Sequence, residues 1–427
     1  MRGDTRQWIE SDKSCAWHPF TPQDSWTDPS HEPLVLVKGE GVWLWDSEGR
    51  KYLDGNASIW TNIHGHGHPH VTGAIKAQLD EVAHTSYLGF ANPRASELAE
   101  RLVGLSPDGL DRVFFSDNGS TAIEVAMKMA VQYRLQTGEP ERTGFVAFTN
   151  AYHGDTMGAA SLGGVSRFFE RFRGLGVTAD FVRSVAELDA LDADGMAAVV
   201  IEPLIQGVNE MRPWPAGMLG ELRAWCDARG VHLILDEVMT GFGRTGTMFA
   251  CEQESVVPDF LCLAKGLTAG YVPMAATLTR EEIYDAFRGG PENAFYYGHS
   301  FTANPVGCAA ALANLELFER DEVLSGLPAK ITHLKNSLAA HFSGNPWVHE
   351  VRQCGMIAGI ELRHPDGVGF SPDERVGERV SIAARGHGML SRPIRDTLVF
   401  LPPLSIALEE IEWGLEAFSK AIGEVLG

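Results

Sequence analysis

Short apolar runs alternate with longer helix-like stretches through the middle of the chain. The strand-like runs lie at 112–116, 144–149, 197–201, 231–235 and 260–264. After the first of them, residues 120–134 carry apolar side chains at helical spacing, with Ile123, Met127 and Ala130 on one face. Apolar strands separated by helices are typical of an α/β fold with a largely parallel sheet. We therefore expect a large α/β domain at 66–315.

The regions before and after this domain follow other patterns. Alternating apolar and polar side chains at 34–53, punctuated by glycines, predict a small antiparallel unit. Helical stretches and the short apolar runs 356–362 and 398–401 predict an α+β domain at 316–427. We expect residues 1–65, an extended arm with tryptophan anchors followed by the antiparallel unit, to join this smaller domain.

Composition narrows the class of protein. A chain of 427 residues is long enough for two domains. The net charge of −21, from 35 basic and 56 acidic residues, argues against nucleic acid or an anionic membrane as partner. The six cysteines show no CxxC spacing, and the N-terminus lacks the apolar core of a secretory signal. No apolar run is long enough for a membrane helix, so we expect a cytoplasmic protein.

Two charged residues each end an apolar run. Asp236 follows 231–235, and Lys265 follows 260–264. Because the carboxyl ends of parallel strands share one rim of a sheet, we expect these side chains, and Glu202, to lie near one another. The pair fits an enzyme of pyridoxal 5′-phosphate (PLP). In such enzymes a lysine amine holds the cofactor aldehyde as a Schiff base, and a carboxylate keeps the pyridine nitrogen protonated.

Each residue of this pair also has an ordinary interpretation. A single lysine is usually solvated, and a single aspartate often caps a helix. The apolar run before Lys265 and the glycine-rich sequence after it favour a buried amine. Burial would lower the pKa of that amine and help it act as a nucleophile and a proton carrier.

Two further loops could contact such a cofactor. Gly119 and Ser120 begin the helix-like stretch after 112–116, where backbone N–H groups and the helix dipole favour a phosphate. A capping turn without a ligand would show the same pattern. Tyr152 follows the run 144–149 and could stack on a flat ring, or it could be an ordinary half-buried tyrosine.

Three other features remain open or point away from metal chemistry. The histidines of HGHGHPH at 64–70 suggest a metal site, but no cysteine or spaced carboxylate completes a ligand set, so we expect no metal. Residues 297–305 fit either a second phosphate loop or a helix start. Arg392, next to a rigid proline, fits either a clamp for a substrate carboxylate or a solvated arginine.

Together these segments resemble the class III PLP-dependent aminotransferases, which have fold type I. LILDEVMTGFGRTG at 233–246 and LAKGLTAGYVPMAA at 263–276 carry the class pattern. WHPFTP at 17–22, LDGNASIWTNIHGHGHP at 53–69 and RPIRDTLVFLPPL at 392–404 resemble the branch that acts in biotin synthesis. The resemblance covers nearly the whole chain. It implies a homodimer with composite active sites that aminates 8-amino-7-oxononanoate, with S-adenosylmethionine or lysine as amino donor.

The resemblance also implies roles for individual residues. Lys265 would carry the cofactor, Asp236 would face the pyridine nitrogen, and Tyr152 would stack on the ring. The residues implied to bind the cofactor are Lys265, Asp236, Gly119, Ser120, Tyr152 and, across the dimer, Ser300. The residues implied to line the substrate pocket are Phe20, Ile59, Trp60, Tyr152 and Arg392, the last as the carboxylate clamp.

Several positions depart from the class pattern. The stretch between Gly164 and Ala197 is short, and Asn118 replaces a more usual serine. Phe20 and Ile59 stand where enzymes that use S-adenosylmethionine carry a tyrosine and a tryptophan, which resembles the branch that uses lysine.

Other functions remain possible at this point. A general ω-amino acid aminotransferase that uses pyruvate or 2-oxoglutarate, or an aminomutase, is the alternative within PLP chemistry. A non-catalytic PLP-binding protein would lack Lys265 or Asp236, and both are present.

Overall fold

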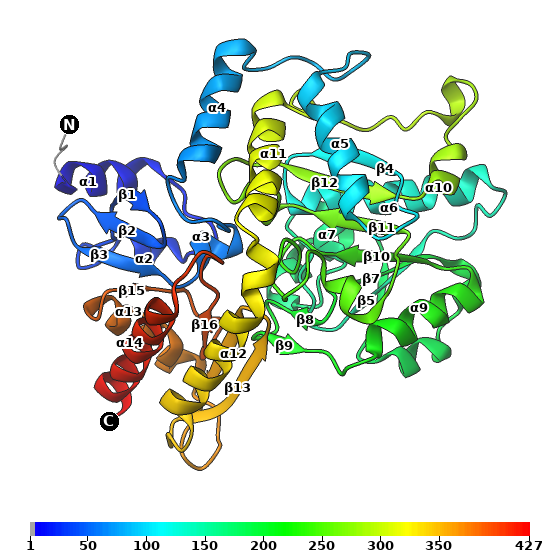
Figure 1. The fold of residues 1–427 in the computed structure, drawn as a ribbon. Coiled ribbons are helices and arrows are strands. Elements are labelled where there is room, and N and C mark those ends of the chain that lie inside the picture. The colour runs from blue at the N-terminus through cyan, green and yellow to red at the C-terminus, as the bar shows by residue number, and fades with distance from the viewer. Residues whose placement is uncertain (1–4) are drawn as a thin grey trace.

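A seven-stranded sheet lies at the centre of the large domain (Figure 1). The computed structural model describes residues 5–427. The strand order is β4-β12-β11-β10-β7-β5-β6. All neighbouring pairs are parallel except those of β12, which runs antiparallel to both β11 and β4. The strands are β4 (Arg112–Ser116), β5 (Gly144–Phe148), β6 (Ala179–Val182), β7 (Met196–Ile201), β10 (His232–Asp236), β11 (Phe260–Leu263) and β12 (Ala275–Thr279).

The strand-like runs predicted from the apolar pattern are confirmed, and both faces of the sheet are buried. Val146 and Val199 belong to one apolar core, whereas their neighbours Ala147 and Val200 belong to another on the opposite face. Helix α6 (Gly119–Gln136) covers the second face. Burial on both faces explains why these strands read as continuous apolar runs. The antiparallel strand β12 was not predicted.

The smaller part of the molecule combines the two ends of the chain (Figure 1). Strand β3 pairs in parallel with β15, so one sheet has the order β1-β2-β3-β15, and a second has the order β13-β14-β16. The strands are β1 (Leu36–Glu40), β2 (Trp43–Asp46), β3 (Lys51–Asp54), β13 (Val348–Cys354), β14 (Ile357–Leu362), β15 (Met389–Leu390) and β16 (Thr397–Phe400). The proposed limits at 65 and 315 remain predictions, and helix α11 (Pro305–Arg320) crosses the second of them.

The expectation of an extended N-terminal arm is wrong. Residues Thr5–Cys15 form helix α1 and Gln23–Thr27 form α2. No proline lies within α1, so its backbone hydrogen bonds can form, whereas the prolines at 19 and 22 separate the two helices. Trp17 does not anchor the arm, since 87% of it is exposed. Trp26 stacks on His18 and donates a hydrogen bond to Asp12, so it holds the segments of the arm to one another.

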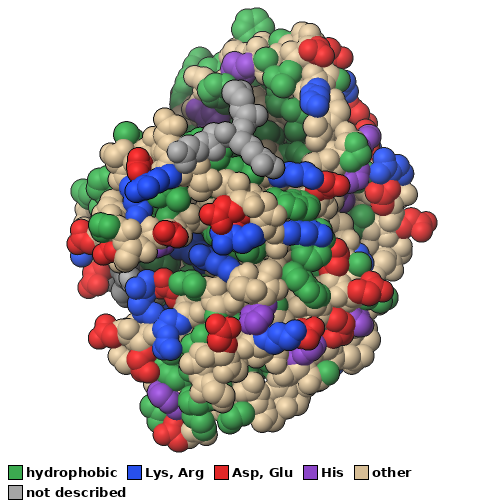
Figure 2. Space-filling model, turned by 90° about the vertical axis from the view of Figure 1, so that its left-hand side faces the viewer, with side chains coloured by type: hydrophobic (Ala, Val, Ile, Leu, Met, Phe, Trp, Pro, Cys, Tyr) green, Lys and Arg blue, Asp and Glu red, His purple; other side chains and the backbone are tan. Residues whose placement is uncertain are grey.

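The remaining elements connect and cover these sheets. They are α3 (Ala57–Trp60), α4 (Pro69–Glu81), α5 (Pro93–Leu105), α7 (Met157–Ser161), α8 (Ser166–Phe169), β8 (Ile205–Gln206), β9 (Arg212–Pro213), α9 (Met218–Arg229), α10 (Glu281–Asp285), α12 (Val323–Phe342), α13 (Val376–Gly386) and α14 (Leu408–Leu426). Within residues 5–427, no helix combines the length and the apolar character of a membrane span. The face formed by the chain ends shows basic and acidic side chains interspersed (Figure 2).

Candidate active site

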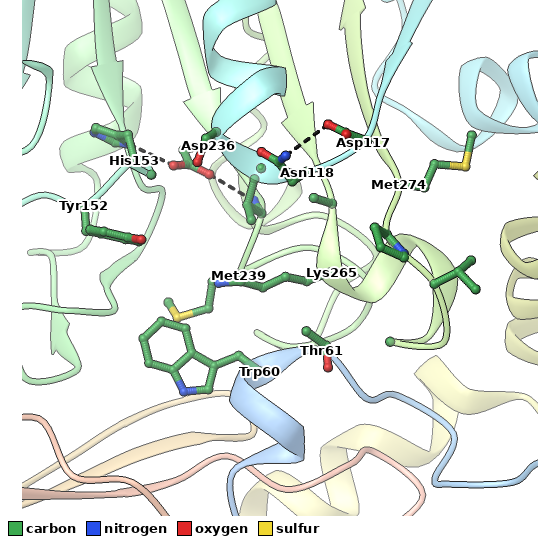
Figure 3. A pocket seen from close by; sticks show the side chains of 18 of the residues that line it. Trp60, Thr61, Asp117, Asn118, Tyr152, His153, Asp236, Met239, Lys265 and Met274 are labelled. Carbon is green, nitrogen blue, oxygen red and sulfur yellow. Dashed lines mark hydrogen bonds and ion pairs between the residues drawn. The ribbon is translucent and has the colours of Figure 1, made fainter. Parts of the chain in front are cut away.

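A cavity of about 410 Å³ opens at the carboxyl ends of the central strands (Figure 3). The ends of β4, β5, β7, β10 and β11 each contribute side chains to it, as expected for a rim shared by parallel strands. Six of the residues predicted from the sequence line this cavity: Trp60, Gly119, Ser120, Tyr152, Asp236 and Lys265. Asp117, His153, Glu202, Met239 and the turn at 270–274 complete most of its wall.

The carboxylate of Asp236 lies on the cavity wall and is held from two sides. His153 Nδ1 donates a hydrogen bond of 2.7 Å to its Oδ2, and the Val238 N–H donates to Oδ1 over 3.1 Å. Burial alone would lower the pKa of His153, but the hydrogen bond and charge of Asp236, with the charge of Glu202, outweigh it, so the pKa is raised. The hydrogen bond therefore places a ring whose protonated form is favoured against the carboxylate of Asp236.

Lys265 lies two residues beyond the end of β11, in a strained backbone conformation. Its φ of 46° lies in the left-handed region, which turns the chain sharply at the end of the strand. Its Nζ lies 4.6 Å from the centre of the Trp60 ring. Burial lowers the pKa of Lys265 to about 8, although the charges of Asp236 and Glu202 oppose the shift. An amine with this pKa has a substantial neutral fraction near neutral pH and can act as a nucleophile or a base.

Glu202 ends β7 on the same wall and is almost fully buried, with 6% exposed. Its carboxylate accepts hydrogen bonds from the Gly207 N–H over 3.0 Å and from the Tyr152 N–H over 3.3 Å. Burial raises the pKa of Glu202 to about 7, with Asp236 adding to the shift and His153 opposing it. Glu202 therefore joins two loops of the site and holds a proton that leaves near neutral pH.

The N-terminus of α6 forms the opposite end of the cavity. Asn118 caps this helix by accepting a hydrogen bond from the Thr121 N–H over 3.0 Å, and Gly119 and Ser120, whose N–H groups have no partner within the helix, line the cavity. A Cβ atom at Gly119 would lie 2.7 Å from Val238 Cγ1, so only glycine allows this close approach. Backbone N–H groups at a helix N-terminus are suited to bind a phosphate.

Aromatic side chains extend from the cavity to the surface. The Tyr152 ring meets Phe168 edge-on at 6.0 Å, and Phe168 meets Phe20 in the same way at 5.4 Å. The Arg392 guanidinium lies 5.8 Å from the centre of the Phe20 ring. Tyr152 donates a hydrogen bond of 2.6 Å to Asp155. The structure thus brings Phe20, Tyr152 and Arg392 to one side of the cavity, through a phenylalanine that the sequence did not single out.

Four of the predicted residues are not part of the cavity lining: Phe20 and Arg392, which lie beside Tyr152 through Phe168, and Ile59 and Ser300. Ile59 is 45% exposed and lies outside the cavity lining. Ser300 is exposed in the loop before α11, where His299 lies 3.9 Å from Asp117. The same loop ends at the N-cap Asn304, so the helix start that 297–305 allowed is present.

The histidines of the HGHGHPH segment serve different partners. His64 contacts Asn314, His66 contacts Asp54, and His70 contacts Glu316. No group of three or more metal-ligating side chains that could hold an ion is found among the described residues. These histidines thus tie the loop to the rest of the fold.

The cavity fits PLP in three separate places. A carboxylate suits the pyridine nitrogen, an amine of lowered pKa suits the aldehyde, and free N–H groups at a helix start suit the phosphate. The His153 ring is bonded to Asp236 through Nδ1, whereas its buried Nε2 has no hydrogen-bond partner among the described residues. A type I fold with this site defines a PLP-dependent transferase.

Comparison with known proteins agrees with this class. The family model for aminotransferase class III matches residues 26–422, so the chain belongs to that family and is a PLP-dependent aminotransferase. The chain is 45% identical to the adenosylmethionine-8-amino-7-oxononanoate aminotransferase of Geobacter sulfurreducens, with 99% of each chain covered.

Solved structures show the same relationship. The enzyme of that name from Methanocaldococcus jannaschii has a TM-score of 0.96 at 36% identity, covering 99% of this chain and 100% of that one. An amine transaminase from an uncultivated Pseudomonas species, solved in its PLP-bound form, has a TM-score of 0.89 at 33% identity, covering 96% of this chain and 99% of that one.

The sequence alone did not identify His153 as the partner of Asp236. The signal was present in NAYHGD, because a histidine in a loop after a strand faces the same rim. Glu202 was placed on that rim but was given no role. Its contacts with Tyr152 and Gly207 come from loops whose paths the pattern does not predict.

Proposed function

We propose that this enzyme transfers an amino group to the ketone of 8-amino-7-oxononanoate to form 7,8-diaminononanoate in biotin synthesis. The observation that carries the proposal is 45% identity over 99% of both chains to a relative with that named activity. The cavity supports it, since an amine, a carboxylate and a phosphate-binding helix start lie at one rim of the sheet.

PLP, when bound, supplies a protonated ring that draws electrons from the reacting carbon. Lys265 would hold the cofactor aldehyde and, once released, would accept and donate the proton of the donor α-carbon. Its lowered pKa, about 8, gives the neutral amine that accepts this proton. Asp236, paired with His153, holds the proton on the ring nitrogen.

The other residues bind and orient. Gly119 and Ser120 bind the phosphate through their N–H groups, and Tyr152 covers the ring. Phe20 and Trp60 form apolar walls for the substrate. Arg392 pairs with its carboxylate, since a guanidinium forms two parallel hydrogen bonds to such a group.

S-adenosylmethionine or lysine is the proposed donor. The names of the relatives favour S-adenosylmethionine. Phe20, however, has no hydroxyl to bond to this donor, and Ile59 has no aromatic ring for an adenine and lies outside the cavity lining.

The decisive experiment measures 7,8-diaminononanoate formed by the PLP-loaded enzyme with each donor in turn. Turnover with either donor supports the proposal, and Lys265→Ala is the matched control that must be inactive. Brisk transfer to pyruvate with none to 8-amino-7-oxononanoate would contradict it. That outcome would favour a general ω-aminotransferase, a function consistent with the likeness to the amine transaminase.

A homodimer with shared active sites is also part of the proposal. Ser300 lies outside the cavity of its own chain, where it could reach the phosphate of a second copy. Exposed apolar side chains surround this loop, and the ring of Phe301 lies 4.6 Å from that of His84. The exposed apolar residues are Leu88, Phe90, Tyr296 and Phe301.

Two measurements test the dimer. Light scattering should give the mass of two chains, and an active monomer would contradict the shared site. Ser300→Asp should weaken PLP binding by placing a negative charge beside the phosphate, whereas Ser300→Asn should affect it less.

The spread of the six free cysteines supports a cytoplasmic location for this enzyme.

A further inference from the structure

Four successive residues beside the active site have positive φ, although none is glycine. In α3 the φ angles are 43° for Ala57, 49° for Ser58, 65° for Ile59 and 68° for Trp60. The ψ angles of Ser58 and Ile59, 52° and 55°, complete a left-handed turn. In this conformation an L-residue brings its Cβ close to the following carbonyl oxygen, so such residues normally occur singly. A run of four requires contacts that hold it.

Two buried side chains provide those contacts. The carboxylate of Asp54, 3% exposed, accepts hydrogen bonds from the Ser58 N–H over 3.0 Å and the Ser58 hydroxyl over 2.8 Å. His66 Nε2 lies 2.9 Å from the same carboxylate. Asn56 accepts a hydrogen bond of 2.9 Å from the Trp60 indole N–H. Asp54 thus holds the start of the turn, and Asn56 holds its last side chain.

The turn decides which of two neighbouring side chains faces the cavity. The Trp60 indole lies over Lys265 and beside Met239 (Figure 3). Trp60 and Met239 together pack against Gly207, where a Cβ would lie 2.7 Å from Met239 Sδ and 3.0 Å from Trp60 Cζ3. Ile59 is directed outward instead. A turn of the usual hand would present a different face of this segment to Lys265.

We infer that Asp54 is a positioning residue for the reaction, because its carboxylate holds Ala57–Trp60 in the left-handed turn that places Trp60 against Lys265. The inference rests on the proposed function in one respect, namely that the cavity beside Trp60 receives the substrate. A general role of Asp54 in folding is the competing explanation, and the two differ in how Asp54 and Trp60 depend on each other.

A double-mutant cycle separates these explanations. Asp54→Ala, Trp60→Ala and the double variant are loaded with PLP, and kcat and KM for the amino acceptor are measured. We expect Asp54→Ala to lower kcat/KM about tenfold in the wild-type background and less than about threefold when Trp60 is already absent. An equal loss in both backgrounds would show that Asp54 does not act through Trp60.

Ser58 provides a matched pair of variants. Its side chain is exposed, and both Ser58→Gly and Ser58→Ala remove the hydroxyl, but only glycine adopts the left-handed conformation without strain. Adding Ser58→Gly to Asp54→Ala should restore kcat/KM about three- to tenfold, whereas adding Ser58→Ala should restore nothing. Equal effects of glycine and alanine would overturn the inference. If Asp54→Ala does not fold, the two single Ser58 variants decide, with alanine expected to be the more harmful.

The kinetics are read with whichever acceptor the wild type uses. A wild type that is inactive on 8-amino-7-oxononanoate would contradict the proposed function, while the cycle could still be measured with pyruvate. A wild type active on 8-amino-7-oxononanoate but without coupling between Asp54 and Trp60 would contradict only the positioning role.

Discussion

Two clusters of charged side chains in this molecule differ in how their buried members are paired. The active-site cluster consists of Lys265, Asp236, His153 and Glu202. It contains one ion pair, between His153 and Asp236. No ion pair within 4.0 Å is found for Lys265 or Glu202 in the part of the chain that the structure describes. Burial therefore moves both pKa values toward neutrality, to about 8 for Lys265 and about 7 for Glu202.

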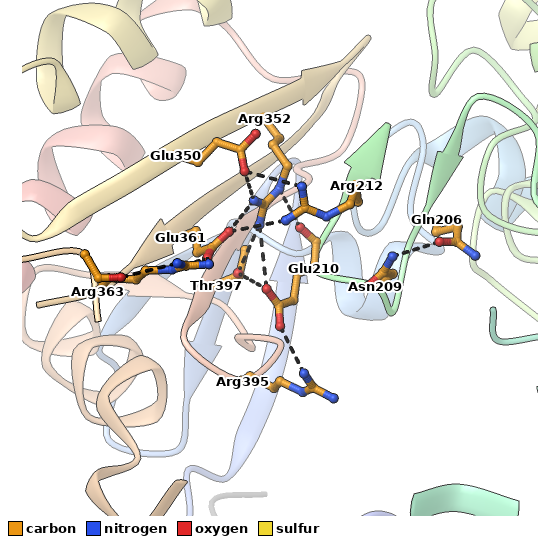
Figure 4. Close-up of polar contacts among 11 residues, drawn as sticks. Gln206, Asn209, Glu210, Arg212, Glu350, Arg352, Glu361, Arg363, Arg395 and Thr397 are labelled. Carbon is orange, nitrogen blue, oxygen red and sulfur yellow. Dashed lines mark hydrogen bonds and ion pairs between the residues drawn. The ribbon is translucent and has the colours of Figure 1, made fainter. Parts of the chain in front are cut away.

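The arginine cluster lies between the β8–β9 hairpin and the β13-β14-β16 sheet (Figure 4). The Arg352 side chain, 3% exposed, pairs with Glu361, with Glu350 at 2.5 Å, and through its Nε–H with the Glu210 carbonyl oxygen at 3.0 Å. Arg363 holds the other oxygen of Glu361 at 2.6 Å. Burial would raise the pKa of Glu361, but these two guanidinium groups outweigh it and lower the pKa.

The difference shows that the partners of a buried charged side chain decide whether it stabilises the fold or exchanges a proton. In the arginine cluster, guanidinium groups at contact distance lower the pKa of the buried Glu361, and the cluster joins two parts of the fold. Where an amine and a carboxylate are buried without such a partner, their protons become mobile near neutral pH. Substitutions in the arginine cluster should therefore cost stability, and those in the active-site cluster should cost turnover.

The largest expected effect is that of Lys265→Ala. Removing the amine removes both the attachment of the cofactor and the carrier of the proton, so turnover should fall by about four orders of magnitude or more. The thermal midpoint should change little, because Lys265 makes no ion pair whose loss leaves a buried charge. Steady-state kinetics measure the turnover, absorbance of the PLP-loaded enzyme measures the attachment of the cofactor, and thermal unfolding measures the midpoint. Wild-type turnover in the Lys265→Ala variant would show that Lys265 does not hold the cofactor or carry the proton.

Arg352→Ala should cost the most stability. Leaving Glu361 buried without its main partner should lower the free energy of unfolding by about 3–5 kcal/mol. Arg363→Ala is the matched control, because the Arg363 side chain is 36% exposed and its loss should cost about 1 kcal/mol or less. Urea unfolding measures both, and the kcat of the folded fraction should stay close to wild type. A large loss of kcat with unchanged stability would erase the distinction between the clusters.

Asp236→Asn should leave folding nearly intact and slow the reaction. The amide fits the same space and can still bond to His153, but it cannot hold a proton on the pyridine nitrogen. By analogy with other preorganised electrostatic contacts, kcat should fall about 10²–10³-fold. Single-turnover rates of the PLP-loaded variant test this, and near-normal rates would count against the role of Asp236.

Glu202→Gln should change how stability depends on pH. The native pKa of about 7 lies above the ordinary 4.5, so the native state binds this proton more tightly than the unfolded state. Wild-type stability should fall relative to the variant as pH rises from 4.5 to 7, by about 2–3 kcal/mol in total. Urea midpoints of cofactor-free protein at pH 5 and pH 8 measure the difference. A constant difference between the two proteins at both pH values would show that Glu202 titrates normally.

The smallest expected effect compares two arginines of one loop. Arg392→Ala should raise KM for the ketone about ten- to a hundredfold, because a charge-assisted pair with the substrate carboxylate is lost. Arg395→Ala should change KM far less, since Arg395 faces Glu210 of the arginine cluster at 3.5 Å. PLP affinity should stay constant in both. The reverse ranking of KM would make Arg395 the clamp.

Much of the fold was predictable because burial leaves a clear pattern. The strands of the central sheet are buried on both faces, so they appear as apolar runs; Asp236 ends one of them, and Lys265 follows another after a single residue. Strand β12 was missed because its sequence, AATLT, holds small and polar side chains instead of a continuous apolar run, although all five residues are buried. The N-terminal helices were missed because few of their side chains are buried, so the pattern there is weak.

The sequence by itself determined the class of fold, the cofactor chemistry and most residues of the site, because strand ends and helix starts are local features. Only the tertiary structure decided how those residues work together. The pairing of His153 with Asp236, the unpaired burial of Glu202 and the left-handed turn that directs Trp60 inward all join segments distant in sequence or conformations that their residues disfavour. Distances between loops and the burial of charges depend on packing, so no local pattern predicts them.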